Sequence, residues 1–418
     1  MEFIVEEEKI DTQTGARLKV FGVGGGGNNA VNSMAASSDM DMVTFLVANT
    51  DAQALQMSPV VDKIQLGDRI TKGLGAGSNP DVGRRAAEED LDAIMKHISG
   101  TDILFLTAGM GGGTGSGALP VIAQAAREMG ILTVAVVTKP FTFEGRRRMR
   151  HANDAIKHIK QSVDTLLVVP NQKLLESVDP KISMLDAFAL SNDVLKQAIK
   201  GISDIIVKPG HINVDFADVR SIMKDMGMAL MGMGRVEGED RARKAAEMAI
   251  NSPLLEDVSI EGARGVLINI TGNTDLGLHE INEAAEVVYN LVSEDANIIL
   301  GSVINQDMGS EIMVTVIATG FEQGGERDAG QEFSPYRTQQ KQEVYRQAPS
   351  HRYVQESHHQ AGADEQMPQQ PSSEQARERE MHMRQDVEPT QSPVQGAFNM
   401  QDLDTPAFLR RGPSQEKE

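Results

Sequence analysis

Short apolar runs, each bounded by glycine or polar residues, recur through the first part of the chain. A length of about four to eight residues is typical of buried strands. Segments with apolar residues at helical spacing separate these runs. Strands that alternate with helices predict a parallel sheet of the doubly wound α/β class. The predicted strands are 18–23, 43–48, 103–106, 132–137 and 163–169.

Helical spacing predicts three helices in this layer, at 30–36, 82–97 and 118–129. The longest helical pattern runs from 183 to 205 and carries few charges before Lys196. An amphipathic stripe with few charges is typical of a helix inside a core. We therefore expect a long, largely buried helix after the parallel sheet.

A second group of elements follows between 262 and 321. A few strands with helices on one face make a small α/β domain. The five methionines between 223 and 233 are interpreted as pliable packing at the junction of the two units. The predicted elements are strands at 266–271, 298–304 and 311–319 and helices at 242–250 and 278–292.

The composition changes after residue 322, where Gln, Ser, Pro, His and charged residues dominate. Such a segment buries too little apolar surface to offset its ordering entropy, which predicts a disordered linker at 323–400. The last stretch, 401–418, regains Leu403, Phe408 and Leu409. A short apolar segment on a long tether is typical of a docking peptide, although a chance apolar remnant would look the same.

The stretch 109–117 holds six glycines in nine residues, between a predicted strand and a predicted helix. This arrangement presents backbone N–H groups and a helix N-terminus to an anion. The stretch does not end in Gly-Lys-Ser/Thr, so it is not a Walker A loop. A phosphate would be held by backbone dipoles and by the hydroxyls of Thr114 and Ser116. The plain alternative is a flexible surface turn.

Two more glycine-rich stretches, 24–29 and 72–80, belong to the same layer. Loops that follow parallel strands meet at one edge of the sheet, so three such loops should converge. Together with Gly22, the first stretch satisfies G-x-G-x-x-G, and Asp51 could bind a ribose. A nicotinamide-dependent dehydrogenase is therefore an alternative at this point. Three converging loops favour a compact nucleotide rich in phosphate.

The chain of 418 residues has a formal net charge of −20 and a pI of about 4.9. This charge argues against broad electrostatic binding to nucleic acid or to an anionic membrane. The absence of cysteine excludes disulfides and thiolate chemistry, and the histidines show no metal-ligand spacing. No signal-peptide core or membrane-spanning apolar run occurs, so we expect a cytoplasmic protein.

A polar loop follows the long predicted helix and carries Asn213, Asp215 and Asp218. Paired carboxylates could orient an attacking water or hold Mg²⁺ together with phosphates. Helix capping and a solvated turn are the plain alternative. Because the loop comes after the long helix, it should emerge at the end of the sheet opposite to the glycine loops. The predicted apolar anchors of this turn are Phe216, Val219 and Ile222.

Taken together, these motifs resemble the FtsZ family, the tubulin-like cell-division GTPases of bacteria. The segment 111–117, Gly-Gly-Gly-Thr-Gly-Ser-Gly, closely matches the tubulin signature loop. The resemblance covers 18–321 and the terminal peptide. Gln172 stands where the family usually has an acidic residue, and the linker has no family pattern. The other matching segments are 24–29, 49–51, 213–218 and 406–410.

The resemblance implies a tubulin-like fold that binds GTP or GDP, with Mg²⁺, at the edge where the glycine loops meet. Ala76 and Gly77 would lie in the loop that senses the γ-phosphate. The residues implied around the phosphates are Gly25, Gly26, Gly27, Asn28, Asn29, Gly113, Thr114 and Gly115.

On the ribose side the resemblance implies Glu144 and Arg148. On the guanine side it implies Asn171, Phe188 and Asn192. An aromatic ring can stack on a base, and an amide can pair with the polar edge of guanine, so these residue types suit the task.

The resemblance also implies subunits stacked head to tail, with GTP between them. Asn213, Asp215 and Asp218 of one subunit would complete the site of the next, so hydrolysis would require polymerisation. The expected setting is the cytokinetic ring at midcell. Residues 402–411 would bind membrane-tether and regulatory division proteins, with no nucleic acid and no direct membrane insertion.

A tubulin-like scaffold that does not hydrolyse GTP is a further alternative, but it would be expected to lack Asp215 or Asp218, and both are present. A dehydrogenase would not explain 109–117 or the acidic loop. The expected division of the chain is a flexible tail (1–15), a GTP-binding domain (16–182), a central helix (183–206), a C-terminal activation domain (207–322), a linker (323–400) and a docking peptide (401–418).

Overall fold

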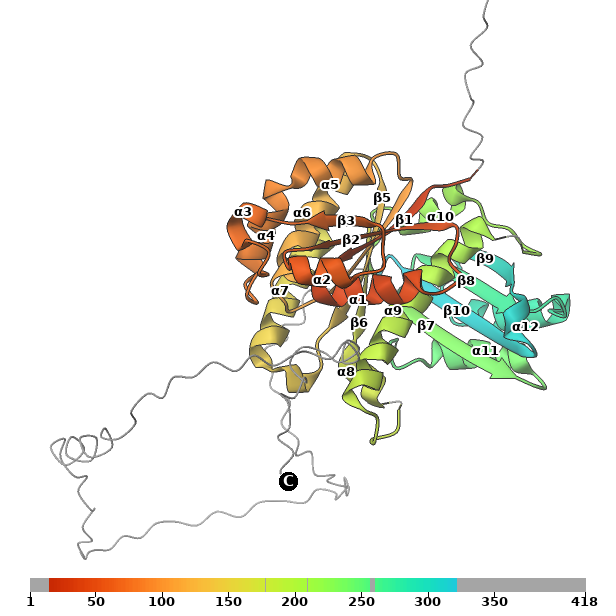
Figure 1. Cartoon of the computed structure of the whole chain (residues 1–418). Helices are drawn as coiled ribbons and strands as arrows, with labels where there is room; N and C mark the ends of the chain where they lie inside the picture. Colours follow the sequence, from red (N-terminus) through yellow and green to blue (C-terminus); the bar gives the residue numbers. More distant parts are fainter. Residues whose placement is uncertain (1–14, 177, 209, 256–259, 322–418) are drawn as a thin grey trace, which may run out of the picture. The chain divides into compact units, whose positions relative to one another are not determined.

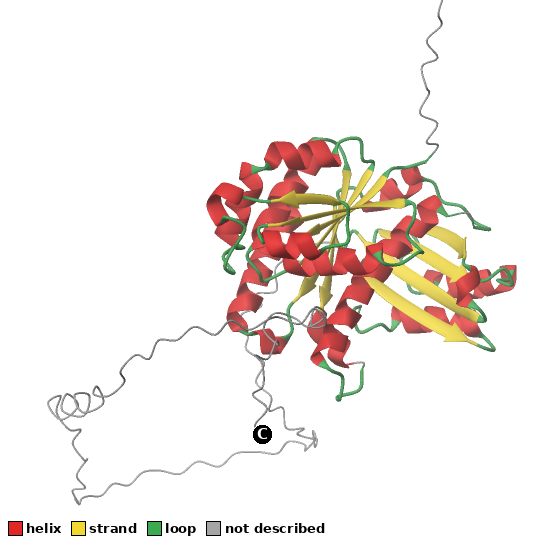
Figure 2. Cartoon of the chain, viewed as in Figure 1, coloured by secondary structure: helices red, strands yellow, loops and turns green. Residues whose placement is uncertain are grey.

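A computed structural model describes residues 15–321, apart from 177, 209 and 256–259. Figure 1 and Figure 2 show this part as an α/β structure in which helices cover both faces of the main sheet. The predicted linker and docking peptide lie outside the described residues, as does all but the last residue of the predicted N-terminal tail.

Ten strands of the described part form one sheet, in the order β3-β2-β1-β4-β5-β6-β7-β10-β8-β9. Neighbours from β3 through β7 are parallel, β10 is antiparallel to β7 and β8, and β9 is parallel to β8. The order of the first six strands is doubly wound, so the predicted parallel sheet is confirmed. The strands are β1 Leu18–Val23, β2 Val43–Asn49, β3 Asp62–Gln65, β4 Ile103–Gly109, β5 Leu132–Lys139, β6 Thr165–Pro170, β7 Gly227–Glu237, β8 Gly265–Gly272, β9 Asn297–Ile304 and β10 Glu311–Thr319.

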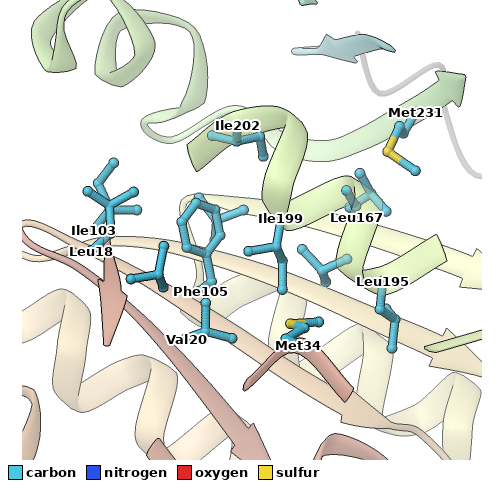
Figure 3. Packing of buried hydrophobic residues seen from close by; sticks show 14 of the residues in the cluster. Leu18, Val20, Met34, Ile103, Phe105, Leu167, Leu195, Ile199, Ile202 and Met231 are labelled. Atoms are coloured by element: carbon cyan, nitrogen blue, oxygen red, sulfur yellow. The ribbon is translucent and has the colours of Figure 1, made fainter. Parts of the chain in front are cut away.

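Alternate residues of the parallel strands face two apolar layers, because successive side chains of a strand point to opposite faces. Val20 and Phe105 pack with helices α1 and α9, as Figure 3 shows for α9. Phe21 and Leu106 pack with α4, α5, α6 and α7 on the other face. The helices are α1 Gly24–Ala35, α2 Ala52–Met57, α3 Asp68–Thr71, α4 Pro80–Glu89, α5 Leu91–Ile98, α6 Thr114–Glu128, α7 Arg146–Ser162, α8 Asn171–Glu176, α9 Met184–Val207, α10 Phe216–Met223, α11 Arg241–Ile250 and α12 Leu278–Tyr289.

Two helices begin earlier than predicted. Helix α1 starts at Gly24, where a loop was expected up to 29, and α6 starts at Thr114 rather than at 118. Glycine is a poor helix former, which made these stretches look like loops. Close packing explains the residue type: a Cβ at Gly26 would lie 3.0 Å from the backbone of Gly109. The single helix predicted at 82–97 is instead two helices, α4 and α5, which meet at Asp90.

The second unit contains a strand that the sequence pattern did not reveal. Strand β7 includes three of the five methionines that were interpreted as junction packing; it lies between β6 and β10, so that interpretation agrees with the structure, although the strand itself was not predicted. Methionine and glycine lack the β-branched signal of a typical strand. Helices α11 and α12 cover one face of β7, β8 and β10, as predicted for a small α/β domain, and Met231 packs with α9 on the other face.

Helix α9 confirms the predicted long helix, and its N-cap Ser183 accepts a hydrogen bond from the backbone N–H of Asp186. Its burial differs from the prediction. Leu185 in the first turn is 50% exposed, whereas the half that carries the charges is buried, including Lys200 and Asp204. Buried charges are tolerated when they are paired, and the Lys200 Nζ lies 2.5 Å from the Asp204 Oδ2.

The same charges tie α9 to the loop before β2. The Lys200 Nζ lies 3.4 Å from the Asp39 Oδ2, and the Lys196 Nζ lies 3.5 Å from the Asp39 Oδ1. Burial acts to lower the pKa of Lys200, but Asp204 and Asp39 outweigh it, so this pKa is raised. Burial acts to raise the pKa of Asp39, but Lys200 and Lys196 bring it below its usual value. Lys200 and Asp39 therefore stay charged at neutral pH, and their ion pair holds α9 against the loop before β2.

Candidate functional site

Three glycine-rich segments meet at the carboxyl edge of the parallel strands. A Cβ at Gly24 would lie 2.8 Å from the backbone nitrogen of Gly115, so α1 and α6 begin side by side. A Cβ at Gly113 would lie 2.8 Å from the backbone nitrogen of Asn79, so the segment 72–80 lies against the start of α6. The hydroxyl oxygens of Thr50 and Thr114 are 2.7 Å apart and link β2 to α6.

The first turns of α1 and α6 leave backbone donors for a ligand. Neither helix has a side-chain hydrogen bond at its N-cap, so the first N–H groups of each lack an intrahelical partner. A Cβ at Gly25 or at Gly112 would meet no atom within 4 Å. Two uncapped helix N-termini beside open space offer backbone amides that can receive an anion.

Asn28 and Asn29, both predicted near the phosphates, are placed differently. Asn28 is 2% exposed. In the amide orientation that satisfies its hydrogen bonds, its side-chain nitrogen donates to the carbonyl oxygens of Gly22, Gly24 and Ala48. Asn28 therefore braces α1 against β1 and β2, whereas Asn29 is exposed.

The predicted ribose residues form a connected pair. The Arg148 Nε lies 3.2 Å from the Glu144 Oε2, and the Glu144 Oε1 accepts a hydrogen bond of 2.8 Å from the backbone N–H of Phe141. A Cβ at Gly111 would lie 2.6 Å from the Arg148 Cγ. Arg148 therefore lies against the glycine-rich segment, and Glu144 fixes the loop that follows β5.

The predicted guanine residues lie around the first half of α9. The Phe188 ring packs edge-on against Phe141 at 5.3 Å between centroids and against Phe143 at 6.3 Å. The buried Asn171 Oδ1 accepts a hydrogen bond of 2.7 Å from the Ser191 hydroxyl. Neither Phe141 nor Phe143 was predicted from the sequence as part of the site, although the pattern Phe-Thr-Phe soon after a predicted strand was a usable signal.

Gln172, which departs from the family pattern, anchors the same loop. Its Oε1 accepts hydrogen bonds from the backbone N–H of Thr142 at 3.2 Å and from the Thr142 hydroxyl at 2.9 Å. The neutral amide thus connects the start of α8 to the segment that carries Phe141 and Glu144.

The acidic loop lies beside the second unit. The Ile212 N–H donates to the Ser302 hydroxyl of β9 at 2.8 Å, and Asn213, Asp215 and Asp218 are exposed. The predicted turn at 216–222 is in fact helix α10. Asp215 is its N-cap, because its Oδ1 accepts from the backbone N–H of Asp218 at 2.9 Å.

Helix α9 separates the two groups of predicted site residues. It begins close to Asn171, which follows the carboxyl end of β6, and its last turn lies beside Asp39, which precedes β2: the Lys208 Nζ donates to the Asp39 carbonyl at 2.8 Å. A helix of 24 residues spans about 36 Å. The glycine loops and the acidic loop therefore lie at opposite edges, and one subunit does not bring them together.

Within the described part, no group of three or more His, Cys, Asp or Glu side chains is arranged to hold a metal ion. A search of the described helices also finds none that is long and apolar enough to cross a membrane.

Comparison with family models assigns both parts of the described chain. The GTPase domain of the tubulin/FtsZ family matches residues 17–179. The C-terminal domain of the FtsZ family matches residues 227–322.

Curated relatives agree with these assignments. A cell division protein FtsZ of Coxiella burnetii is 55% identical over 306 residues, which are 73% of this chain and 79% of that protein. Its counterpart in Pseudomonas aeruginosa is 54% identical over 306 residues, 73% of this chain and 77% of that protein.

Solved structures also resemble this fold. An empty FtsZ dimer from M. jannaschii has a TM-score of 0.71 at 42% identity, and the match covers 74% of this chain and 89% of that one. CetZ2 from Haloferax volcanii, a GTPγS-bound protofilament, has a TM-score of 0.63 at 20% identity over 73% of this chain and 94% of that one, a likeness of fold alone. The identities and the two matched domains exclude the dehydrogenase alternative: the chain belongs to the tubulin/FtsZ family of GTPases, in its FtsZ branch.

Proposed function

We propose that this GTPase binds GTP with its phosphates against the first turns of α1 and α6. The observation that carries the proposal is the pair of uncapped helix N-termini beside open space at Gly25 and Gly112. Backbone amides and helix dipoles attract phosphate locally even in a chain of net charge −20. The other proposed phosphate contacts are Gly26, Gly27, Asn29, Ala76, Gly77, Gly113, Thr114 and Gly115, with Asn28 bracing α1.

The base and the ribose would extend from there toward α9. Phe188 packs edge-on against the stacked pair Phe141 and Phe143, so it would offer a preoriented face for stacking on guanine. Asn192 is half-buried on the next turn and would pair with the polar edge of the base. Glu144 and Arg148 would face the ribose.

Hydrolysis would require a second subunit. Asp215 and Asp218 are exposed at the edge opposite to the phosphate site, so a head-to-tail contact would bring them to the nucleotide of the next subunit. The solved FtsZ of M. jannaschii is described as a dimer, which supports self-association. A heterologous contact that does not close on itself builds a filament.

In this shared site the acids would act on water. A carboxylate that accepts a proton from water, or orients it, raises its nucleophilicity toward the γ-phosphate. Asn213 would add an amide that holds the water in line. Mg²⁺, held mainly by phosphate oxygens, would neutralise charge on the leaving group.

The experiment is turnover measured against protein concentration, with GTP and Mg²⁺, beside light scattering and sedimentation. If the site is shared, phosphate release per subunit rises steeply above a critical concentration, together with filament mass. Release that stays proportional to protein at all concentrations, without assembly, would contradict the shared site.

The relatives are named cell division proteins, which supports a role at the division site. The filaments would form the cytokinetic ring at midcell, in the cytoplasm. Residues 402–411, outside the described residues, would dock membrane-tether and regulatory proteins through Leu403, Phe408 and Leu409.

Removal of 402–418 is expected to leave GTPase activity and filament formation unchanged, because neither depends on the tail in this scheme. Recruitment of the filaments to membranes by tether proteins should be lost. Co-sedimentation with vesicles that carry the tethers measures the effect. Undiminished recruitment of the truncated chain would remove the docking role of the peptide.

A further inference from the structure

A cavity of about 350 Å³ lies beside the proposed phosphate site, between α7 and the first turns of α4 and α6. Its floor includes Ser116 and Ala155, which are 3% and 5% exposed. Arg147 and His158 also line it and are exposed, so the cavity runs from a buried floor to an open mouth.

The cavity and the proposed phosphate site share a wall. Asn79 lines the cavity, and its backbone nitrogen lies against Gly113. Ser116 lines it too, and its hydroxyl accepts a hydrogen bond of 2.8 Å from the backbone N–H of Gly111. A single layer of residues therefore separates the proposed phosphate site from the cavity at this point.

The cavity leads away from the nucleotide edge. Helix α7 follows β5 and runs back along the sheet, and its side chains line the cavity from Arg147 to His158. The eleven helical steps from Arg147 to His158 span about 16 Å. The cavity therefore extends from the nucleotide edge along the flank of the domain.

We infer that this cavity is the exit path of inorganic phosphate after GTP hydrolysis, an inference that rests on the proposed function. In a filament, the neighbouring subunit would close the outer face of the nucleotide site, and GDP would remain bound beneath it. The released phosphate then needs a lateral route. The wall formed by Asn79 and Ser116 separates the phosphate site from a space that reaches solvent. It is closed in this structure, because a Cβ at Gly113 would lie 2.8 Å from the Asn79 nitrogen, so the starts of α4 and α6 would have to part for phosphate to pass.

The charged residues that line the cavity suit the passage of phosphate better than its tight binding. Arg147 and the imidazoles of His151 and His158 offer donors to an anion, whereas Asp81 and Asp154 oppose it. An ion can pass through a cavity when it binds there strongly enough to enter and weakly enough to leave. With this mixed lining, phosphate would be bound weakly and released again.

The test follows the two steps separately in filaments of the full chain. Quench-flow measures GTP cleavage, and a fluorescent phosphate-binding sensor measures release. Arg147→Gln is expected to leave cleavage unchanged and to slow release about fivefold, because the anion loses a charged donor along its way. Arg150→Gln is the matched control, since it removes the same charge from an exposed arginine of α7 that does not line the cavity.

Ala155→Leu narrows the floor without changing charge and should delay release in the same way, with thermal unfolding as the check on folding. Release that keeps pace with cleavage in Arg147→Gln, or an equal delay in Arg150→Gln, would overturn the exit path. A folded Ala155→Leu with no delay would overturn it as well. Wild-type cleavage that does not depend on assembly would instead refute the proposed shared site, before release is compared.

Discussion

Asp218→Ala is expected to bind GTP as tightly as the wild type in dilute, monomeric protein, yet to lose turnover by about 100-fold or more. The reason is geometric: Asp218 is exposed at the far end of α9, whereas the proposed nucleotide contacts surround the start of α9. Binding by fluorescence anisotropy of a labelled GTP and turnover by phosphate release measure the two effects. Glu247→Ala, an exposed acid on α11, is the control and should change neither.

Mixing two defective variants makes the test sharper. One subunit lacks Asp218 but binds GTP, and the other carries a substitution in its phosphate site but keeps Asp218. If each active site is built from two subunits, a 1:1 mixture forms about one quarter of its junctions with both halves intact. At a GTP concentration well below the Kd of the phosphate-site variant, the mixture then regains activity that neither variant has alone. No regain in co-assembled filaments, or loss of GTP binding by monomeric Asp218→Ala, would place the acids and the nucleotide in one subunit.

Gly112→Ala provides the phosphate-site partner and is the second large effect that we expect. Its methyl group would meet no protein atom within 4 Å, and the backbone does not have a positive φ, so the fold should tolerate it. The methyl would occupy space proposed for phosphate. Overpacking costs about 2 kcal/mol, which corresponds to a roughly 30-fold weaker GTP affinity.

Titration with labelled GTP measures this loss, and thermal unfolding without nucleotide should show an unchanged midpoint. Gly262→Ala, in the second unit, is the control and should leave the affinity unchanged, because its Cβ would make only an ordinary contact of 3.9 Å with Phe321. An unchanged affinity for Gly112→Ala, with a folded protein, would show that the phosphates do not lie against the start of α6.

Much of the parallel sheet could be predicted from apolar runs, because strands buried on both faces have a continuous apolar pattern. The prediction 18–23 for β1 agrees with the structure residue for residue. Strand β7 was not predicted, because its methionines and glycines carry a weak strand signal. The starts of α1 and α6 were placed four to six residues late for a related reason: glycine lowers helix propensity. Close backbone contacts explain these glycines: a Cβ at Gly27 would collide with the Thr107 carbonyl oxygen, and one at Gly117 would collide with the Pro80 carbonyl oxygen.

For the candidate site, the sequence alone determined which residue types gather near each strand end and, through the resemblance, which family to expect. Local spacing carries this information, because a glycine-rich stretch between a strand and a helix recurs where backbone N–H groups bind an anion. The sequence also predicted that the long helix places the acidic loop opposite to the glycine loops, and α9 confirms this. Only the tertiary structure decided that Asn28 faces backbone carbonyls and that Phe141 and Phe143 brace Phe188. These two features depend on the directions of side chains from segments that are distant in the chain, and no local sequence pattern records those directions.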